Sequence, residues 1–143
     1  MQVQPQPQPQ TQSMCHTKTK YSCWKNGELV SADQAVVSIY DHGLLYGDGC
    51  FEGLRFYHRH PFRLDRHLAR LRRSLSALAI TVPYTDDTLA QAVMACIARS
   101  GMGDGYLRIL VTRGEGDMGL NPRNCTAPNV FIIPASLSLV SDE

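Results

Sequence analysis

Lysine is nearly missing from this 143-residue sequence: its three lysines end at Lys25, whereas all eleven arginines follow that residue. A chemistry that needs a buried lysine amine as its nucleophile therefore finds no such group in the rest of the chain. Lys18 and Lys20 stand beside threonines after a glutamine- and proline-rich start, where solvated side chains are expected. Cationic groups for binding are present as arginine, but a reactive amine is not.

Strong net charge, long apolar runs and paired cysteine motifs are absent as well. Lys plus Arg is 14 and Asp plus Glu is 13, so no overall field draws the protein to nucleic acid or to an anionic membrane. No apolar run reaches membrane-spanning length. The five cysteines form no CxxC pair and follow no signal peptide, which favours reduced thiols and a cytoplasmic location. Cys15, His16 and Cys23 lack a fourth ligand, so we expect no metal site.

The common catalytic signatures GxSxG, GxxxxGK and HExxH are also missing. What is present is the composition of one globular domain, with 43% hydrophobic and 19% charged residues. We expect a disordered Gln/Pro-rich tail over residues 1–20, a folded domain over 21–134 and the start of a linker over 135–143.

Short β-rich segments open and close the predicted domain. Residues 21–24, the turn at Asn26-Gly27 and residues 28–30 form a common hairpin signal. Further strands are expected over 50–57, 106–113 and 129–133, and a long loop over 114–128. Alternation along 50–57 places Phe51, Gly53, Arg55 and Tyr57 on one face, and Cys50, Glu52, Leu54 and Phe56 on the other.

Two helices are expected between these strands. Leucines from Leu64 to Leu78 recur at steps of four and three residues, which predicts an apolar stripe that packs on a sheet. Thr85 followed by two aspartates predicts the start of a second helix, and Gly101 predicts its end. The order of elements predicts an α+β fold, a two-layer sandwich of a mainly antiparallel sheet with two helices.

Arg70 is the most informative arginine of the first helix. It lies beside the leucine stripe, so we expect its guanidinium to reach a groove at the sheet edge and to hold a phosphate with two parallel hydrogen bonds. For a single arginine on a charged helix face, simple solvation is the usual alternative. His67, one turn earlier, is by itself typical of a partly buried structural histidine.

Arg55 shares a strand face with the aromatic Phe51 and with Gly53, and Arg108 is the one charge within the otherwise uncharged strand segment 106–112. An inward-facing arginine normally needs an anionic partner, so both positions predict a pocket wall that admits a carboxylate. The alternative is an internal salt bridge with Glu52, Asp48 or Asp117.

Several motifs stand in a fixed order along the chain. They are YGDGCFEGLR at 46–55, RHLARL at 66–71, YLR at 106–108 and TRGEGDMGLNP at 112–122. Together they resemble the class IV pyridoxal-phosphate-dependent aminotransferases, over residues 24 to about 134. The FEG-hydrophobic-R and MG-hydrophobic-NP segments are most similar to branched-chain amino acid aminotransferases, while D-amino acid aminotransferases and aminodeoxychorismate lyase are close relatives.

The resemblance implies a role for individual residues. Arg70 matches the arginine that grips the phosphate of pyridoxal 5′-phosphate. The wall of the family's substrate pocket is matched by Phe51, Gly53, Arg55 and Arg108. The two arginines would suit anionic groups such as the glutamate side chain. In the family homodimer, the residues that complete the neighbouring subunit's pocket match Tyr46, Met118 and Leu120. The implied reaction moves an amino group between leucine, isoleucine or valine and 2-oxoglutarate.

The resemblance also implies that a part is missing. In the family the Schiff-base lysine lies on a second domain after a linker, so we expect this chain to correspond to the small N-terminal domain and to be inactive alone. Two alternatives remain open. One is a non-catalytic partner domain that pairs with a full-length relative through the loop at 114–122 and an apolar sheet surface, and the other is a plain anion-binding module that uses Arg70 and Arg55.

Overall fold

The computed structural model describes residues 21–136; the expected tail over 1–20 and residues 137–143 lie outside the described part. Six strands form one sheet, and every pairing between them is antiparallel. The elements are, in chain order, β1 (Cys23–Lys25), β2 (Glu28–Val30), α1 (His42–Tyr46), β3 (Gly49–Tyr57), β4 (His60–Pro61), α2 (Leu64–Ala77), α3 (Asp86–Ser100), β5 (Gly105–Thr112), the 3₁₀ turn η1 (Pro122–Asn124) and β6 (Asn129–Ala135).

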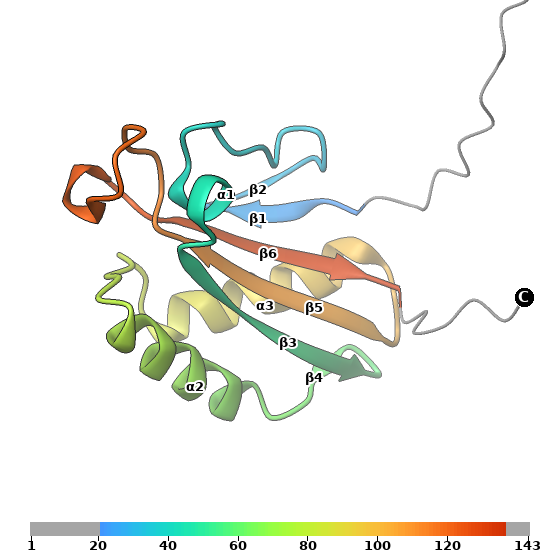
Figure 1. The fold of residues 1–143 in the computed structure, drawn as a ribbon. Helices are drawn as coiled ribbons and strands as arrows, with labels where there is room; N and C mark the ends of the chain where they lie inside the picture. Colours follow the sequence, from blue (N-terminus) through green and yellow to red (C-terminus); the bar gives the residue numbers. More distant parts are fainter. Residues whose placement is uncertain (1–20, 137–143) are drawn as a thin grey trace, which may run out of the picture.

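The spatial order of the strands is β2-β1-β6-β5-β3-β4 (Figure 1). The predicted hairpin is confirmed as β1 and β2, joined by Asn26 and Gly27, which both have positive φ as a tight hairpin turn requires. Residues 58–61 are not purely the turn that the sequence predicts, because His60 and Pro61 pair with the end of β3 as the short strand β4. Proline fits there since an edge strand needs no donor on its outer side.

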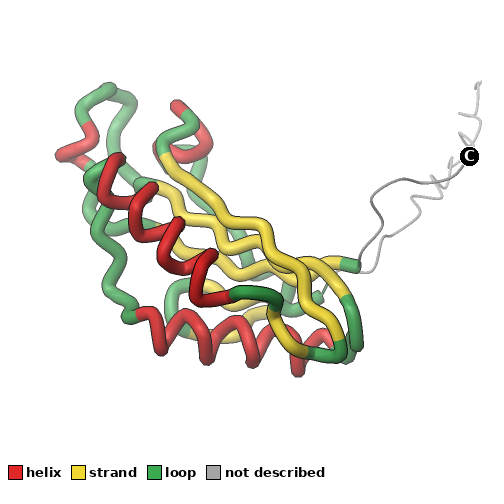
Figure 2. The backbone as a smooth tube through the Cα atoms, turned by 90° about the horizontal axis from the view of Figure 1, so that it is seen from below, coloured by secondary structure: helices red, strands yellow, loops and turns green. Residues whose placement is uncertain are grey.

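Helices α2 and α3 cover one face of the sheet, as Figures 1 and 2 show from two directions. The leucine stripe of α2 is confirmed: Leu68, Leu71 and Leu75 are buried, and the stripe's two end leucines pack against the same core. In α3 the Thr85 hydroxyl accepts from the amide of Thr88, and the helix ends at a left-handed Gly101. Both predicted caps are therefore present.

The core lies between these helices and the inward faces of β3, β5 and β6. Its sheet side is formed by Leu54, Phe56, Leu107, Ile109, Val111, Val130 and Ile132, all of which are almost fully buried. Fully burying one such side chain stabilises the fold by about 1.5–3 kcal/mol. The two-layer α+β architecture with its antiparallel sheet is thus confirmed, and the chain adds one short helix, α1, that stands apart from the helix layer (Figure 1).

The opposite face of β3 and β5 carries no helix, and side chains of mixed character stand on it. Phe51, Arg55 and Tyr57 of β3 are exposed, as is Arg108 of β5, whereas Glu52, Leu54 and Phe56 point to the helices. We call this the open face of the sheet. The alternation predicted for β3 is therefore confirmed.

In the part of the chain that the structure describes, no helix is long and apolar enough to cross a membrane.

Candidate functional site

A buried carboxylate organises the contact between α2 and β3. Glu52 is 5% exposed and projects from the helix-facing side of β3. Its two oxygens accept from Nε and Nη2 of Arg70, each at 2.7 Å, and Oε2 also accepts from Nδ1 of His67 at 2.9 Å. The hydrogen bond from Arg70 lowers the pKa of Glu52, with His67 acting in the same direction against the opposing effect of burial. Glu52 is therefore a carboxylate at neutral pH.

A hollow of about 350 Å³ opens beside this cluster, lined by Phe62, Arg63, Arg66, His67 and Arg70. The side chain of Arg70 is 58% exposed although it is bonded to a buried acid. A guanidinium carries five N–H donors, and the fork to Glu52 uses two of them. Nη2 also lies 3.4 Å from Nδ1 of His67, so Nη1 is the group that remains for another ligand. Within residues 21–136 neither Arg63 nor Arg66 forms a salt bridge, so their two positive charges at the hollow are not neutralised by an ion pair.

Arg108 stands at the centre of the open face. It lies opposite Gly53 in the pairing of β3 with β5, and its guanidinium is 4.5 Å from the centre of the Phe51 ring. A Cβ at position 53 would come within 2.3 Å of the Tyr106 hydroxyl, so a side chain there would have to displace the Tyr106 ring. The missing side chain lets the Tyr106 ring lie across the strand, and its centre is 6.0 Å from the Arg108 guanidinium, farther than that of Phe51.

Arg55 shares the open face, where Nη1 donates to the Tyr57 hydroxyl at 3.4 Å. The alternative of an internal salt bridge for Arg55 and Arg108 is wrong for the described residues. Glu52 points to the other side of the sheet and is engaged there, and Asp48 is paired with Arg113. Both open-face arginines therefore remain available to an external anion.

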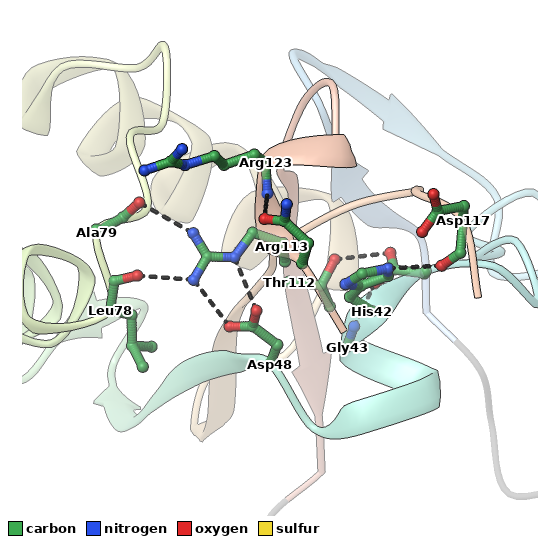
Figure 3. A network of polar contacts seen from close by, with 11 residues as sticks. His42, Gly43, Asp48, Leu78, Ala79, Thr112, Arg113, Asp117 and Arg123 are labelled. Carbon is green, nitrogen blue, oxygen red and sulfur yellow. Dashed lines mark hydrogen bonds and ion pairs between the residues drawn. The ribbon is translucent and has the colours of Figure 1, made fainter. Parts of the chain in front are cut away.

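The third predicted group lies where α1 meets the loop at 114–128. The Tyr46 hydroxyl donates to the carbonyl of Met118. Nε2 of the buried His42 bonds the carbonyl of Asp117 at 2.8 Å, as Figure 3 shows. Met118 and Leu120 are 64% and 78% exposed. The helix thus holds the loop in place while the apolar side chains of the loop point away from the protein.

The base of that loop is held by Arg113, a residue that carried no prediction. Its guanidinium forms a two-bond fork to Asp48 at 2.8 and 3.1 Å and donates to the carbonyls of Leu78 and Ala79 (Figure 3). Those carbonyls belong to the end of α2, where a positive group is favourable. Gly114 follows with φ of +95°, and any Cβ there would overlap the backbone of Ala127. This clasp joins the end of α2, the start of β3 and the loop.

The structure thus separates the predicted residues into three places: Arg70 with the hollow, Phe51, Gly53, Arg55 and Arg108 on the open face, and Tyr46, Met118 and Leu120 at the loop. The sequence did not predict that Glu52 would contact both Arg70 and His67. Alternation turned Glu52 toward the helices, and helical spacing placed His67 and Arg70 one turn apart, but neither pattern gives the offset between β3 and α2 that brings them together. Among residues 21–136 no group of His, Cys, Asp and Glu side chains suits a metal ion.

Comparison with known proteins shows which family this chain resembles. Residues 49–142 match the family of amino-transferase class IV proteins. A Methanocaldococcus jannaschii protein with the provisional name branched-chain-amino-acid aminotransferase is 44% identical over 108 residues, which are 76% of this chain and 38% of that protein. The branched-chain-amino-acid aminotransferase of Salmonella typhimurium is 36% identical over 110 residues, covering 74% of this chain and 36% of the relative.

A solved structure of the same family has a similar fold. The T.th. branched-chain amino acid aminotransferase in complex with N-(5′-phosphopyridoxyl)-L-glutamate superposes with a TM-score of 0.79 at 28% identity, over 87% of this chain and 42% of that one. The chain therefore spans about 40% of the length of these relatives. With the fold, the ordered motifs and the family match in agreement, the chain belongs to the class IV aminotransferases.

Proposed function

We propose that residues 21–134 form the small N-terminal domain of a branched-chain amino acid aminotransferase. In this proposal the domain holds the phosphate of pyridoxal 5′-phosphate and the carboxylates of an amino acid and a 2-oxo acid. Relatives with branched-chain names are 44% and 36% identical to this chain, whereas a D-alanine aminotransferase is 30% identical. A 4-amino-4-deoxychorismate lyase structure is 36% identical but superposes with a TM-score of 0.66, against 0.77 for a branched-chain enzyme. These values support the branched-chain substrate class.

The observation that carries the proposal is the state of Arg70. Its guanidinium is fixed by a buried carboxylate, yet more than half of the side chain is exposed beside a hollow with two further arginines. A purely structural arginine would spend its donors inside the fold. Phosphate oxygens are the ligands that such a preoriented fork accepts best.

The open face supports the second half of the proposal. Arg55 and Arg108 have no acidic partner in the described residues, and the exposed ring of Phe51 lies beside the Arg108 guanidinium on the same face. A carboxylate can pair with an arginine there while an aliphatic side chain contacts the ring. The T.th. relative was solved with a phosphopyridoxyl-glutamate, a ligand that joins a phosphate to two carboxylates.

When bound, pyridoxal 5′-phosphate supplies the electron sink for amino transfer, and the chain's own residues bind and orient. A lysine amine is still required, and the described chain offers only Lys25. Its row in the sheet runs through Phe131 and Leu110 to Phe51, three strand spacings away or about 14 Å. Its amine donates to the Val36 carbonyl at 2.9 Å. Lys25 is therefore unsuited to replace the missing group.

Binding of pyridoxamine 5′-phosphate to the purified chain, followed by ³¹P NMR, tests the phosphate role. This probe is chosen because it forms no imine with lysine. Arg70→Ala should weaken binding by about tenfold or more, since a charge-assisted fork is lost. Arg73→Ala, on the exposed side of the same helix, is the matched control and should bind like the wild type. Equal affinity of the Arg70 variant and the control would overturn the proposal.

The isolated chain should show no transamination with pyridoxal 5′-phosphate, leucine and 2-oxoglutarate, and turnover would contradict the proposal. A second function, that of a non-catalytic partner domain, is favoured by the exposed Met118 and Leu120 on a loop held from behind. Pull-down with an intact relative separates the two: restored activity supports a split enzyme, and binding without activity supports a partner domain.

A further inference from the structure

We propose that Glu52 is a positioning residue, which fixes the guanidinium of Arg70 at the hollow before any phosphate arrives. The proposal rests on the proposed role of Arg70 as the phosphate ligand. It adds a function for a carboxylate that lies on the opposite side of the strand from the open face and whose two oxygens are bonded to Arg70 and His67.

The contrast in burial between the two partners supports this direction of control. Glu52 is anchored in β3 and 5% exposed, whereas the Arg70 side chain is 58% exposed on α2. A surface arginine samples many rotamers, and a ligand that binds it must restrict them. The fork to Glu52, with both bonds at 2.7 Å, already restricts the plane and the reach of the guanidinium.

His67 is held by the same carboxylate. An ionised carboxylate only accepts hydrogen bonds, so the contact of 2.9 Å requires that Nδ1 of His67 carries the proton. Nε2 then has no hydrogen-bond partner among the described residues, and the ring lines the hollow. Glu52 therefore orients two of the five side chains that bound the hollow.

Electrostatics alone makes the opposite prediction, which gives the proposal a sharp test. Glu52 places a negative charge next to an anion site, so its removal should strengthen phosphate binding if charge were its only contribution. Positioning predicts weaker binding, because the guanidinium becomes free to leave the hollow. Glu52→Asp separates the effects further, since it keeps the charge but shortens the reach by one methylene.

The experiment measures pyridoxamine 5′-phosphate affinity for the 143-residue chain by ³¹P NMR, after circular dichroism has shown each variant to be folded. Glu52→Gln and Glu52→Asp should both bind about five- to tenfold more weakly, the range expected for ordering one arginine side chain. Glu28→Gln, an exposed acid on β2 at the far edge of the sheet, is the matched control and should change little. In an Arg70→Ala background, Glu52→Gln should cause no further loss.

Unchanged or tighter binding by both Glu52 variants would overturn the positioning role while leaving Arg70 as the ligand. If Arg70→Ala itself has no effect, the proposed function fails instead, so the two failures are distinguishable. A measurement on the wild type alone guards against unfolded variants: the Nε–H of Arg70 should exchange slowly with solvent, and rapid exchange would also refute a fixed guanidinium.

Discussion

The clasp made by Arg113 allows the most demanding test of the fold. Arg113 and Asp48 are 15% and 22% exposed, and the guanidinium also satisfies two carbonyls at the end of α2. Arg113→Met keeps the apolar stem but leaves a half-buried carboxylate and both carbonyls without their partner. Removal of one member of a fully buried pair lowers the free energy of unfolding by about 3–5 kcal/mol. Because this pair is only partly buried, Arg113→Met should lower it by about 3 kcal/mol, the lower end of that range.

The chain contains its own control, a second Arg–Asp pair with similar distance and greater exposure. Arg72 and Asp86 are 33% and 54% exposed and lie 2.7 Å apart. Exposed pairs contribute about 0.2–1 kcal/mol, so Arg72→Met should destabilise the fold by no more than about 1 kcal/mol. Two pairs of the same chemistry should therefore differ about threefold in effect.

Urea unfolding followed by Trp24 fluorescence measures both variants. Trp24 is the chain's single tryptophan, 5% exposed and in edge contact with the Tyr84 ring at 4.9 Å, so its emission should change on unfolding. With a slope of about 1.5 kcal/mol per molar urea, Arg113→Met should lower the midpoint by about 2 M and Arg72→Met by under about 0.7 M. Equal midpoint shifts would show that burial of the clasp does not govern its strength.

Three further outcomes follow. The pKa of Glu52 is lowered from 4.5 in the folded protein, so the wild type should be more stable than Glu52→Gln by its full margin above pH 4.5, and this margin should shrink as pH falls through the folded pKa. Urea midpoints of both proteins measured at a series of acidic pH values would show this, and a margin that grows in acid would contradict the pairing. Gly53→Ala should displace the Tyr106 ring at a cost of about 1–3 kcal/mol, visible as shifted ring resonances, and an unmoved ring would contradict the close approach. Burial raises the pKa of Cys96 to about 12, so a thiol reagent at about pH 8 should label Cys96 only after unfolding. Labelling of Cys96 itself in the folded protein, located by peptide mapping, would refute its burial.

Local patterns were sufficient to predict the sheet and its helices. Alternation along β3 and the leucine spacing of α2 each report which side of one element is buried, and both were confirmed. The fork between Glu52 and Arg70 was beyond that reach, because its two residues stand 18 positions apart on elements whose relative offset only packing decides. The clasp of Arg113 depends likewise on where α2 ends, and β4 exists only because the neighbouring strand leaves an edge for it.

The sheet has one face sealed by helices and one left bare, and this division bears on how such proteins diversify. Residues such as Leu54 and Ile109 hold the scaffold together, so change there is penalised whatever the enzyme does. Phe51 and Arg108 contribute little to that scaffold, and mutation can sample new chemistry at their positions without first undoing the fold. This chain is similar to a D-alanine aminotransferase, to a 4-amino-4-deoxychorismate lyase and to branched-chain amino acid aminotransferases. Such a range of reactions is expected where one face of the sheet keeps the fold stable and the other face is free to change.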